Sequence, residues 1–165
     1  MARPPRDQPL LLSVLDRLSD EEPDRARDSQ INLGDHLAAL RSAVRRDLEA
    51  LLNARQRCMG WAPELTELEQ SVAGYGIPDF SGANLVSAEH RATYLRAINQ
   101  IIARFEPRFR TVRVTPLTNA DALDRTLRFR IYAEIEATPA PEPVIFDSVL
   151  DPSSRNFAVA SADNA

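Results

Sequence analysis

The sequence contains no lysine and only one cysteine, and both scarcities limit what the chain can be. All 20 basic residues are arginines, so an arginine is informative here only through its place in a pattern. Cys58 has no second cysteine with which to form an intrachain disulfide. The net charge of −4 and the pI near 5.2 argue against a general phosphate-binding surface. We therefore expect no nucleic-acid partner.

Motifs with a known chemical mechanism are also missing. The chain has no phosphate loop, no G-x-G-x-x-G, no H-E-x-x-H and no G-x-S-x-G. His36 and His90 lack the spacing of metal ligands, so we expect neither a metal nor a cofactor. A carboxylate pair such as Glu106 with Asp79 could serve a glycoside hydrolase, but any acidic chain offers such pairs. These absences predict a protein that is not an enzyme.

Long apolar runs are absent as well. The leucines at 10–12 are followed by Ser13 and Asp16 before a signal-peptide core could form, and nothing is long enough to cross a membrane. We expect a cytoplasmic protein. Residues 1–9 are rich in proline and arginine, and residues 152–165 are small and polar. Both are predicted to be flexible tails on a single domain at 10–151.

A short amphipathic helix is predicted near the N-terminus, because four apolar residues fall on one side of it: Leu11, Val14, Leu15 and Leu18. A helix of about three turns is marginal in isolation. It could dock on its own domain or in the groove of a partner, and the sequence leaves both open.

Two long helices follow. The first runs from an N-cap at Asp35 to about residue 57, with one apolar side and one rich in arginine and acid. That polar side is predicted to be a solvated face with local ion pairs. The second starts after Ser87 and ends at Phe105, because Pro107 forces Glu106 out of the helical region.

The period changes to two beyond Pro107, which predicts strands. They are expected at 111–115, at 127–136 and at 144–149, where the mostly apolar composition suggests burial on both sides. Short connections favour antiparallel neighbours. The predicted fold is α+β: a small antiparallel or mixed sheet of about three to four strands from the C-terminal half, packed on two long helices, with a short N-terminal helix.

Several segments, taken in order, resemble one family. Glu106, Pro107 and Arg108 match the Glu-Pro-Arg triplet that follows a helix in the type VI secretion baseplate subunit TssE, a relative of the phage baseplate wedge protein and of baseplate-assembly protein W. Similar segments are Asp16-Arg17 with its flanking leucines, the helical residues 46–53, the loop 75–80 and the strand 146–151. The resemblance covers residues 10–151.

The resemblance implies a structural role in a contractile injection machine. Such a protein would bind the wedge proteins TssF and TssG, contact the adaptor TssK indirectly, and template the sheath of TssB and TssC by strand exchange. It would be cytoplasmic, in a membrane-docked baseplate, without inserting into the membrane. Because relatives were once called lysozyme-like, a peptidoglycan hydrolase is the alternative.

The roles of the candidate site residues stay open at this stage. Glu106, Pro107 and Arg108 could hold the corner together internally or face the sheath, and both hold if a rigid corner must present a sheet edge. The apolar side of the N-terminal helix is the candidate wedge-binding surface.

Overall fold

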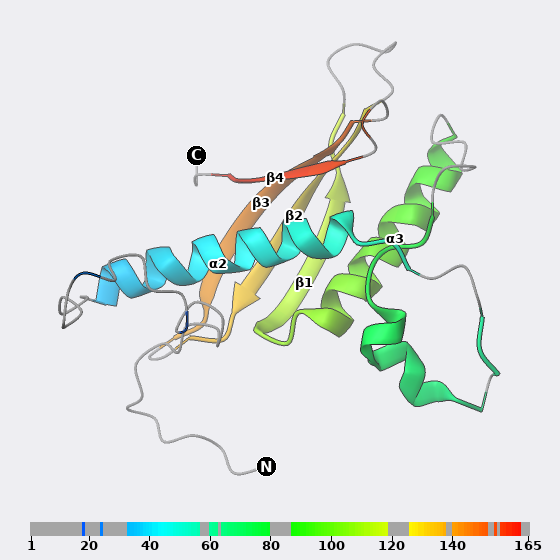
Figure 1. Cartoon of the computed structure of the whole chain (residues 1–165). Helices are drawn as coiled ribbons and strands as arrows, with labels where there is room; N and C mark the ends of the chain where they lie inside the picture. Colours follow the sequence, from blue (N-terminus) through cyan, green and yellow to red (C-terminus); the bar gives the residue numbers. More distant parts are fainter. Residues whose placement is uncertain are drawn as a thin grey trace.

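A computed structural model of the chain gives the architecture (Figure 1). It describes residues 18, 24, 33–56, 60–62, 64–79, 87–118, 126–137, 140–151, 154 and 156–162. Two long helices and a four-stranded sheet are formed over these residues, which confirms the predicted α+β class. Helix α2 spans Leu33–Asn53 and helix α3 spans Ala88–Phe105. Two short 3-10 turns, Thr66–Gln70 and Val72–Gly74, lie between them.

The sheet is antiparallel throughout, and its strands lie side by side in chain order, β1-β2-β3-β4. Their bounds are Phe109–Pro116 for β1, Leu127–Ile135 for β2, Glu142–Leu150 for β3 and Phe157–Ser161 for β4. Consecutive antiparallel pairing is the arrangement that short connections favour.

The C-terminal strand corrects one prediction. Residues 152–165 were expected to form a flexible tail, but Phe157–Ser161 pairs with β3 as β4. Phe157 and Val159 point into the core, and Ala158 and Ala160 are exposed. This alternation covers only five residues, mostly small ones, so composition hid it.

Helix boundaries need smaller corrections. Helix α2 begins at Leu33, so Asp35 lies inside the helix and is not its N-cap, and the helix ends at Asn53 before the predicted residue 57. Ser87 occupies the N-cap position of α3 as expected, although its side chain makes no capping hydrogen bond. Helix ends are the least determined part of a periodic pattern, because the apolar spacing continues into the flanking residues.

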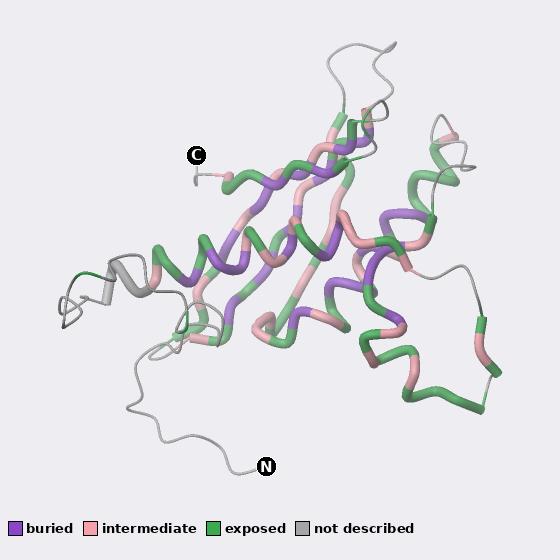
Figure 2. The backbone as a smooth tube through the Cα atoms, viewed as in Figure 1, coloured by how far each residue is buried: buried purple, intermediate pink, exposed green. Residues whose placement is uncertain are grey.

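Both helices cover the same face of the sheet, and Figure 2 shows buried and more exposed positions alternating along the strands. Strand β3 is therefore buried on one face, whereas burial on both was expected. Helix α3 packs chiefly on β1, and α2 on β4. The largest fully buried side chains join the two layers into one core: Phe129, Phe146, Phe157, Leu48, Leu52, Ile77, Ile98, Ile102, Ile131, Ile135, Leu150 and Val44.

Of the predicted N-terminal helix, the structure describes only Leu18. Leu11, Val14 and Leu15 lie outside the described residues, and Leu18 is a helical residue whose surface is 79% exposed. Among the helices described, none is long and apolar enough to cross a membrane.

Candidate functional site

The predicted corner joins α3 to β1 through Glu106, Pro107 and Arg108. Glu106 follows the helix with a non-helical backbone (φ −113°, ψ 82°), and its N–H donates to the Ile102 carbonyl at 2.9 Å. Its own carbonyl accepts the N–H of Phe109 at 3.2 Å. The proline therefore falls where the last helical bond has been made and the strand has not begun, which confirms that Glu106 leaves the helix.

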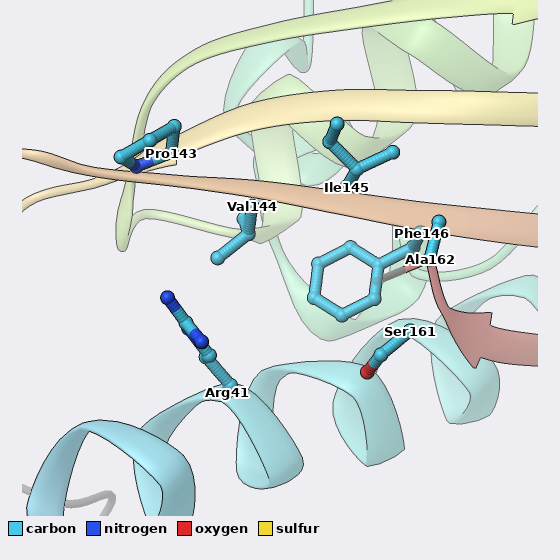
Figure 3. A pocket seen from close by; sticks show the side chains of 7 residues that line it. All are labelled: Arg41, Pro143, Val144, Ile145, Phe146, Ser161 and Ala162. Carbon is cyan, nitrogen blue, oxygen red and sulfur yellow. The ribbon is translucent and has the colours of Figure 1, made fainter. Parts of the chain in front are cut away.

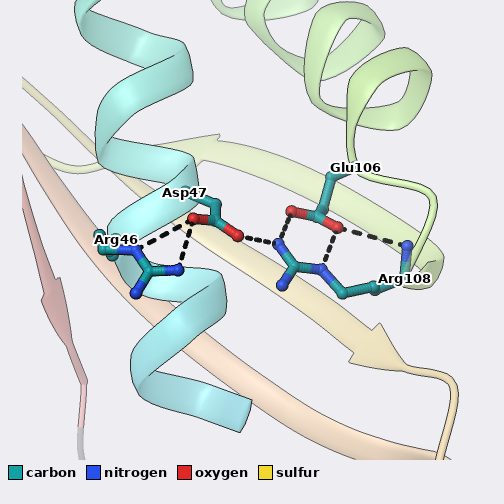
Figure 4. A network of polar contacts seen from close by, with 4 residues as sticks. All are labelled: Arg46, Asp47, Glu106 and Arg108. Atoms are coloured by element: carbon teal, nitrogen blue, oxygen red, sulfur yellow. Dashed lines mark hydrogen bonds and ion pairs between the residues drawn. The ribbon is translucent and has the colours of Figure 1, made fainter. Parts of the chain in front are cut away.

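Glu106 and Arg108 form a forked ion pair across this corner. The Arg108 Nε donates to Glu106 Oε1 at 2.6 Å and its Nη2 to Oε2 at 2.5 Å (Figure 4). The Arg108 backbone N–H also reaches Oε1, at 3.3 Å. The Glu106 residue is only 5% exposed, so this carboxylate is stabilised mainly by the guanidinium. Two parallel charge-assisted bonds fix orientation as well as distance.

Asp47 extends the pair to the other helix. Arg108 Nη2 also donates to Asp47 Oδ2 at 2.7 Å, and Arg46 donates to Asp47 Oδ1 from Nε and Nη2 at 3.2 and 3.1 Å. We call these four residues, Arg46, Asp47, Glu106 and Arg108, the corner network (Figure 4). Through it the middle of α2 is tied to the start of β1, which is distant in sequence.

The electrostatics of the corner follow from these contacts. The Glu106 hydrogen bond raises the pKa of Arg108 above its ordinary value, Asp47 adds to the effect, and partial burial opposes it. Burial raises the pKa of Tyr75, and the charges of Asp47 and Glu106 raise it further. The Tyr75 ring meets Phe105 edge to face at 5.3 Å. The guanidinium thus stays charged, and the tyrosine stays neutral, across the physiological range.

The surface over the corner is a shallow hollow of about 340 Å³. Its lining is formed by Asp47, Leu51, Tyr75, Phe105, Glu106, Pro107 and Arg108. Both oxygens of Glu106 already accept hydrogen bonds, and Asp79, the other carboxylate considered, is exposed. Within the described part of the chain, no three His, Cys, Asp or Glu side chains gather to hold a metal ion. The geometry is that of a mechanical tie between elements.

The loop that resembles the family's Y-G-[LI]-P-D-F segment is also tied to α2. Ile77 donates its N–H to the Ala54 carbonyl at 3.0 Å and accepts from Gln56 at 2.9 Å, just past the end of the helix. Gly76, directly before Ile77, has φ +105°, and a Cβ there would lie 2.8 Å from the Ala54 oxygen. Only glycine fits both requirements.

Sequence reasoning found two of the four members of the corner network, Glu106 and Arg108, and misassigned the other two. Asp47 and Arg46 were attributed to a solvated helix face with local ion pairs. Arg45 does pair locally with Glu49 at 3.0 Å, but Asp47 reaches Arg108 on another element. The available signal was that Asp47 precedes Leu48, which is completely buried, and so lies at the edge of the apolar stripe.

No curated protein matches the chain. The family model described as baseplate wedge protein gp25 matches residues 38–140, which include most of α2, the Gly76 loop, the corner network and the first two strands. The match covers more than half of the 165 residues. The chain therefore belongs to the baseplate wedge protein gp25 family.

Proposed function

We propose that the chain is the TssE-type baseplate subunit of a type VI secretion machine. In this role it joins TssF and TssG in the wedge and presents its sheet as the first template for the sheath of TssB and TssC. The observation that carries the proposal is the family match over residues 38–140, which contains the whole corner network. The role is structural, as in the rest of a family of baseplate components.

The corner network supports a template function. A template must hold its sheet at a fixed angle to the surface that binds the wedge. Arg108 bonds Glu106 within the corner and Asp47 on α2, and these two ion pairs tie α2 to the junction of α3 and β1. Glu106, Pro107 and Arg108 act by holding this angle and thereby orienting the sheet toward the sheath.

The N-terminal apolar side is proposed as the wedge anchor. Leu18 is 79% exposed, as expected for a side chain that is covered only in a complex. A variant lacking residues 1–20 should keep its thermal unfolding transition and co-purify less with TssF and TssG. If that transition is lost, the segment belongs to the domain's own core.

Catalysis is not part of the proposed role. Glu106, the carboxylate that a hydrolase would need, is engaged by Arg108 through both oxygens. Purified protein should release no soluble fragments from peptidoglycan. Release that disappears in Glu106→Gln but persists in Glu69→Gln, an exposed carboxylate, would support the lysozyme-like alternative instead.

The cellular test uses a fluorescent sheath subunit. Cells without the chain should form no sheaths, and the wild-type chain should restore them. The chain is expected in the cytoplasm, at the membrane-docked baseplate, with TssK reached through the wedge. Sheath formation that is normal without the chain would refute the proposed function.

A further inference from the structure

Strand addition needs a free sheet edge, and the β4 edge is largely closed by α2. The Asp151 N–H donates to Asn156 and the Ala162 N–H to Ile145. Even-numbered residues of β4 therefore pair with β3, and odd-numbered ones face outward. At Phe157 both outward groups are taken, because Asn53 of α2 accepts its N–H at 2.8 Å and donates to its carbonyl at 2.9 Å.

Other contacts cover part of the remaining edge. Arg45 donates to the outward carbonyl of Val159 at 3.3 Å. Beyond the end of β4, the next position of β3 is Pro143, which has no N–H to offer. Arg41 of α2 lies over this segment (Figure 3). Its guanidinium pairs with Glu142. A partner strand would have to displace the side chains of Asn53 and Arg45 to pair along the Phe157 end of this edge.

The β1 edge is differently built. The Leu117 N–H donates to the Arg128 carbonyl at 2.9 Å, so Val112, Val114 and Pro116 turn their backbone groups away from the sheet. Pro116 has no N–H, and the Val114 N–H donates to Asn99 Oδ1 of α3 at 3.0 Å. The carbonyls of Val114 and Pro116 have no hydrogen-bond donor among the described residues. Between Val114 and Pro116 this edge offers free acceptors only, and Asn99 lies where the carbonyl of a partner strand would bind the Val114 N–H.

A groove lies beside this part of β1. Helix α3 and β1 meet at the corner and diverge toward the N-terminal end of α3 (Figure 1). The space between them measures about 540 Å³. It is lined by Ala88, Arg91, Ala92, Leu95, Arg96, Asn99, Gln100, Val114, Pro116, Leu117 and Thr118. These residues include two arginines and no carboxylate, although the whole chain has a net charge of −4.

We propose that the groove between α3 and β1 receives an extended acidic segment of the partner protein that assembles on the sheet. Its backbone N–H groups pair with the Val114 and Pro116 carbonyls, and its carbonyl replaces Asn99 at the Val114 N–H. Its carboxylates meet Arg91 and Arg96. The identity of this partner as the sheath rests on the proposed function; the edge and the chemistry of the segment rest on the groove.

The test fills the groove without touching the core. Ala92 and Ala103 are both exposed on α3, but only Ala92 lines the groove. In cells, Ala92→Trp should remove sheaths while the protein still co-purifies with TssF and TssG, and Ala103→Trp should leave both unchanged. Normal sheaths with Ala92→Trp would overturn the inference and leave the proposed function standing. Loss of wedge binding by Ala92→Trp would overturn it too, because the groove would then serve the wedge.

Two measurements on purified protein complete the test. A short synthetic peptide that alternates glutamate with valine should bind the wild-type protein at least about tenfold more tightly than it binds Ala92→Trp. The wild-type protein should also bind this peptide at least about tenfold more tightly than a peptide that alternates lysine with valine. The odd-numbered amides of β1 are already paired with β2, so the readout is exchange at the outward-facing Val112 and Val114, which should slow on binding while 157–161 stay unchanged. Equal binding of both peptides, or protection at 157–161 alone, would contradict the assignment. Strong protection of the outward-facing Val112 amide in the free chain, from a segment of its own, would do the same.

Discussion

At the scale of single residues, the corner shows why position matters more than residue type in a chain whose only basic residue is arginine. Arg104 and Arg108 both pair with carboxylates. The Arg104 pair with Glu69 is exposed on both sides, whereas Arg108 faces a carboxylate that is 5% exposed. Water can replace Arg104, but it has little access to Glu106. The two arginine–glutamate pairs therefore contribute very different amounts to the free energy of unfolding.

The first prediction concerns Arg108→Met. It leaves the buried Glu106 carboxylate without its main partner and should lower the free energy of unfolding by about 3–5 kcal/mol. Arg104→Met, the matched control, should cost about 0–1 kcal/mol. Urea unfolding measures both. Adding Glu106→Gln to Arg108→Met should recover part of the loss, and a double variant less stable than the single one would contradict a buried pair.

The second prediction is a pH dependence at Asp147. It lies directly opposite Arg130 on β2, whose Nε and Nη2 donate to the two carboxylate oxygens at 2.6 and 2.8 Å. The Arg130 hydrogen bonds lower the pKa of Asp147 below 3.8, while partial burial opposes this. The stabilisation is present above the unfolded pKa and is lost as pH falls through the folded one.

Asp147→Asn should therefore have a lower Tm than wild type near neutral pH, and the difference should close as pH falls through the lowered pKa that Asp147 has in the folded state. In an Arg130→Gln background the same substitution should give no pH-dependent difference. Thermal melts of the four proteins across this range make the comparison. A difference that persists in strong acid would assign the effect to packing.

At the scale of whole elements, the outward backbone groups of each edge strand form hydrogen bonds with an asparagine of the helix packed on that strand. Asn53 of α2 satisfies both outward groups of Phe157, as a neighbouring strand would, and Asn99 of α3 satisfies one group of Val114. Side-chain amides can imitate a strand because they carry one acceptor and two donors. They also keep an isolated sheet from pairing at random.

The third prediction compares these two asparagines. Asn53→Ala leaves an N–H and a carbonyl of a buried residue unpaired and should cost about 2–3 kcal/mol, whereas Asn99→Ala leaves one group and should cost about 1 kcal/mol. Amide exchange resolves the effect by strand: residues 157–161 should exchange faster in Asn53→Ala only. Equal protection of β4 in both variants would mean that α2 packing alone holds the strand.

At the scale of the whole molecule, sequence periodicity predicted the elements whose residues repeat at a regular spacing. The helix ending at Phe105, the turn of the chain at Pro107 and the alternation from Leu127 onward were all visible in the sequence, because each repeats a spacing or imposes a backbone restriction. The tie from Asp47 to Arg108 was not visible, because it joins residues that only the tertiary fold brings together. Strand β4 was missed because two buried positions among alanines make no pattern.

The final prediction tests whether that missed strand belongs to the core. Phe157 is 1% exposed, packs edge to face on Phe129 at 5.9 Å, and pairs with Leu150 on β3. Phe157→Ala should lower the free energy of unfolding by about 3–5 kcal/mol, a large part of the roughly 5–15 available to a small domain. Ala158→Ser, on the exposed side of the same strand, should change it by less than about 0.5 kcal/mol.

Because the ring lies between the sheet and α2, the loss should appear as one cooperative transition at lower denaturant with an unchanged slope. A strand docked loosely on a finished domain would behave differently: β4 would exchange its amides first, and the midpoint would stay near that of wild type. That second result would mean that residues 157–161 behave as part of the flexible tail that composition predicted. A single cooperative transition would instead show that β4 belongs to the same folding unit as the corner, although β4 lies beyond the end of the family match at residue 140.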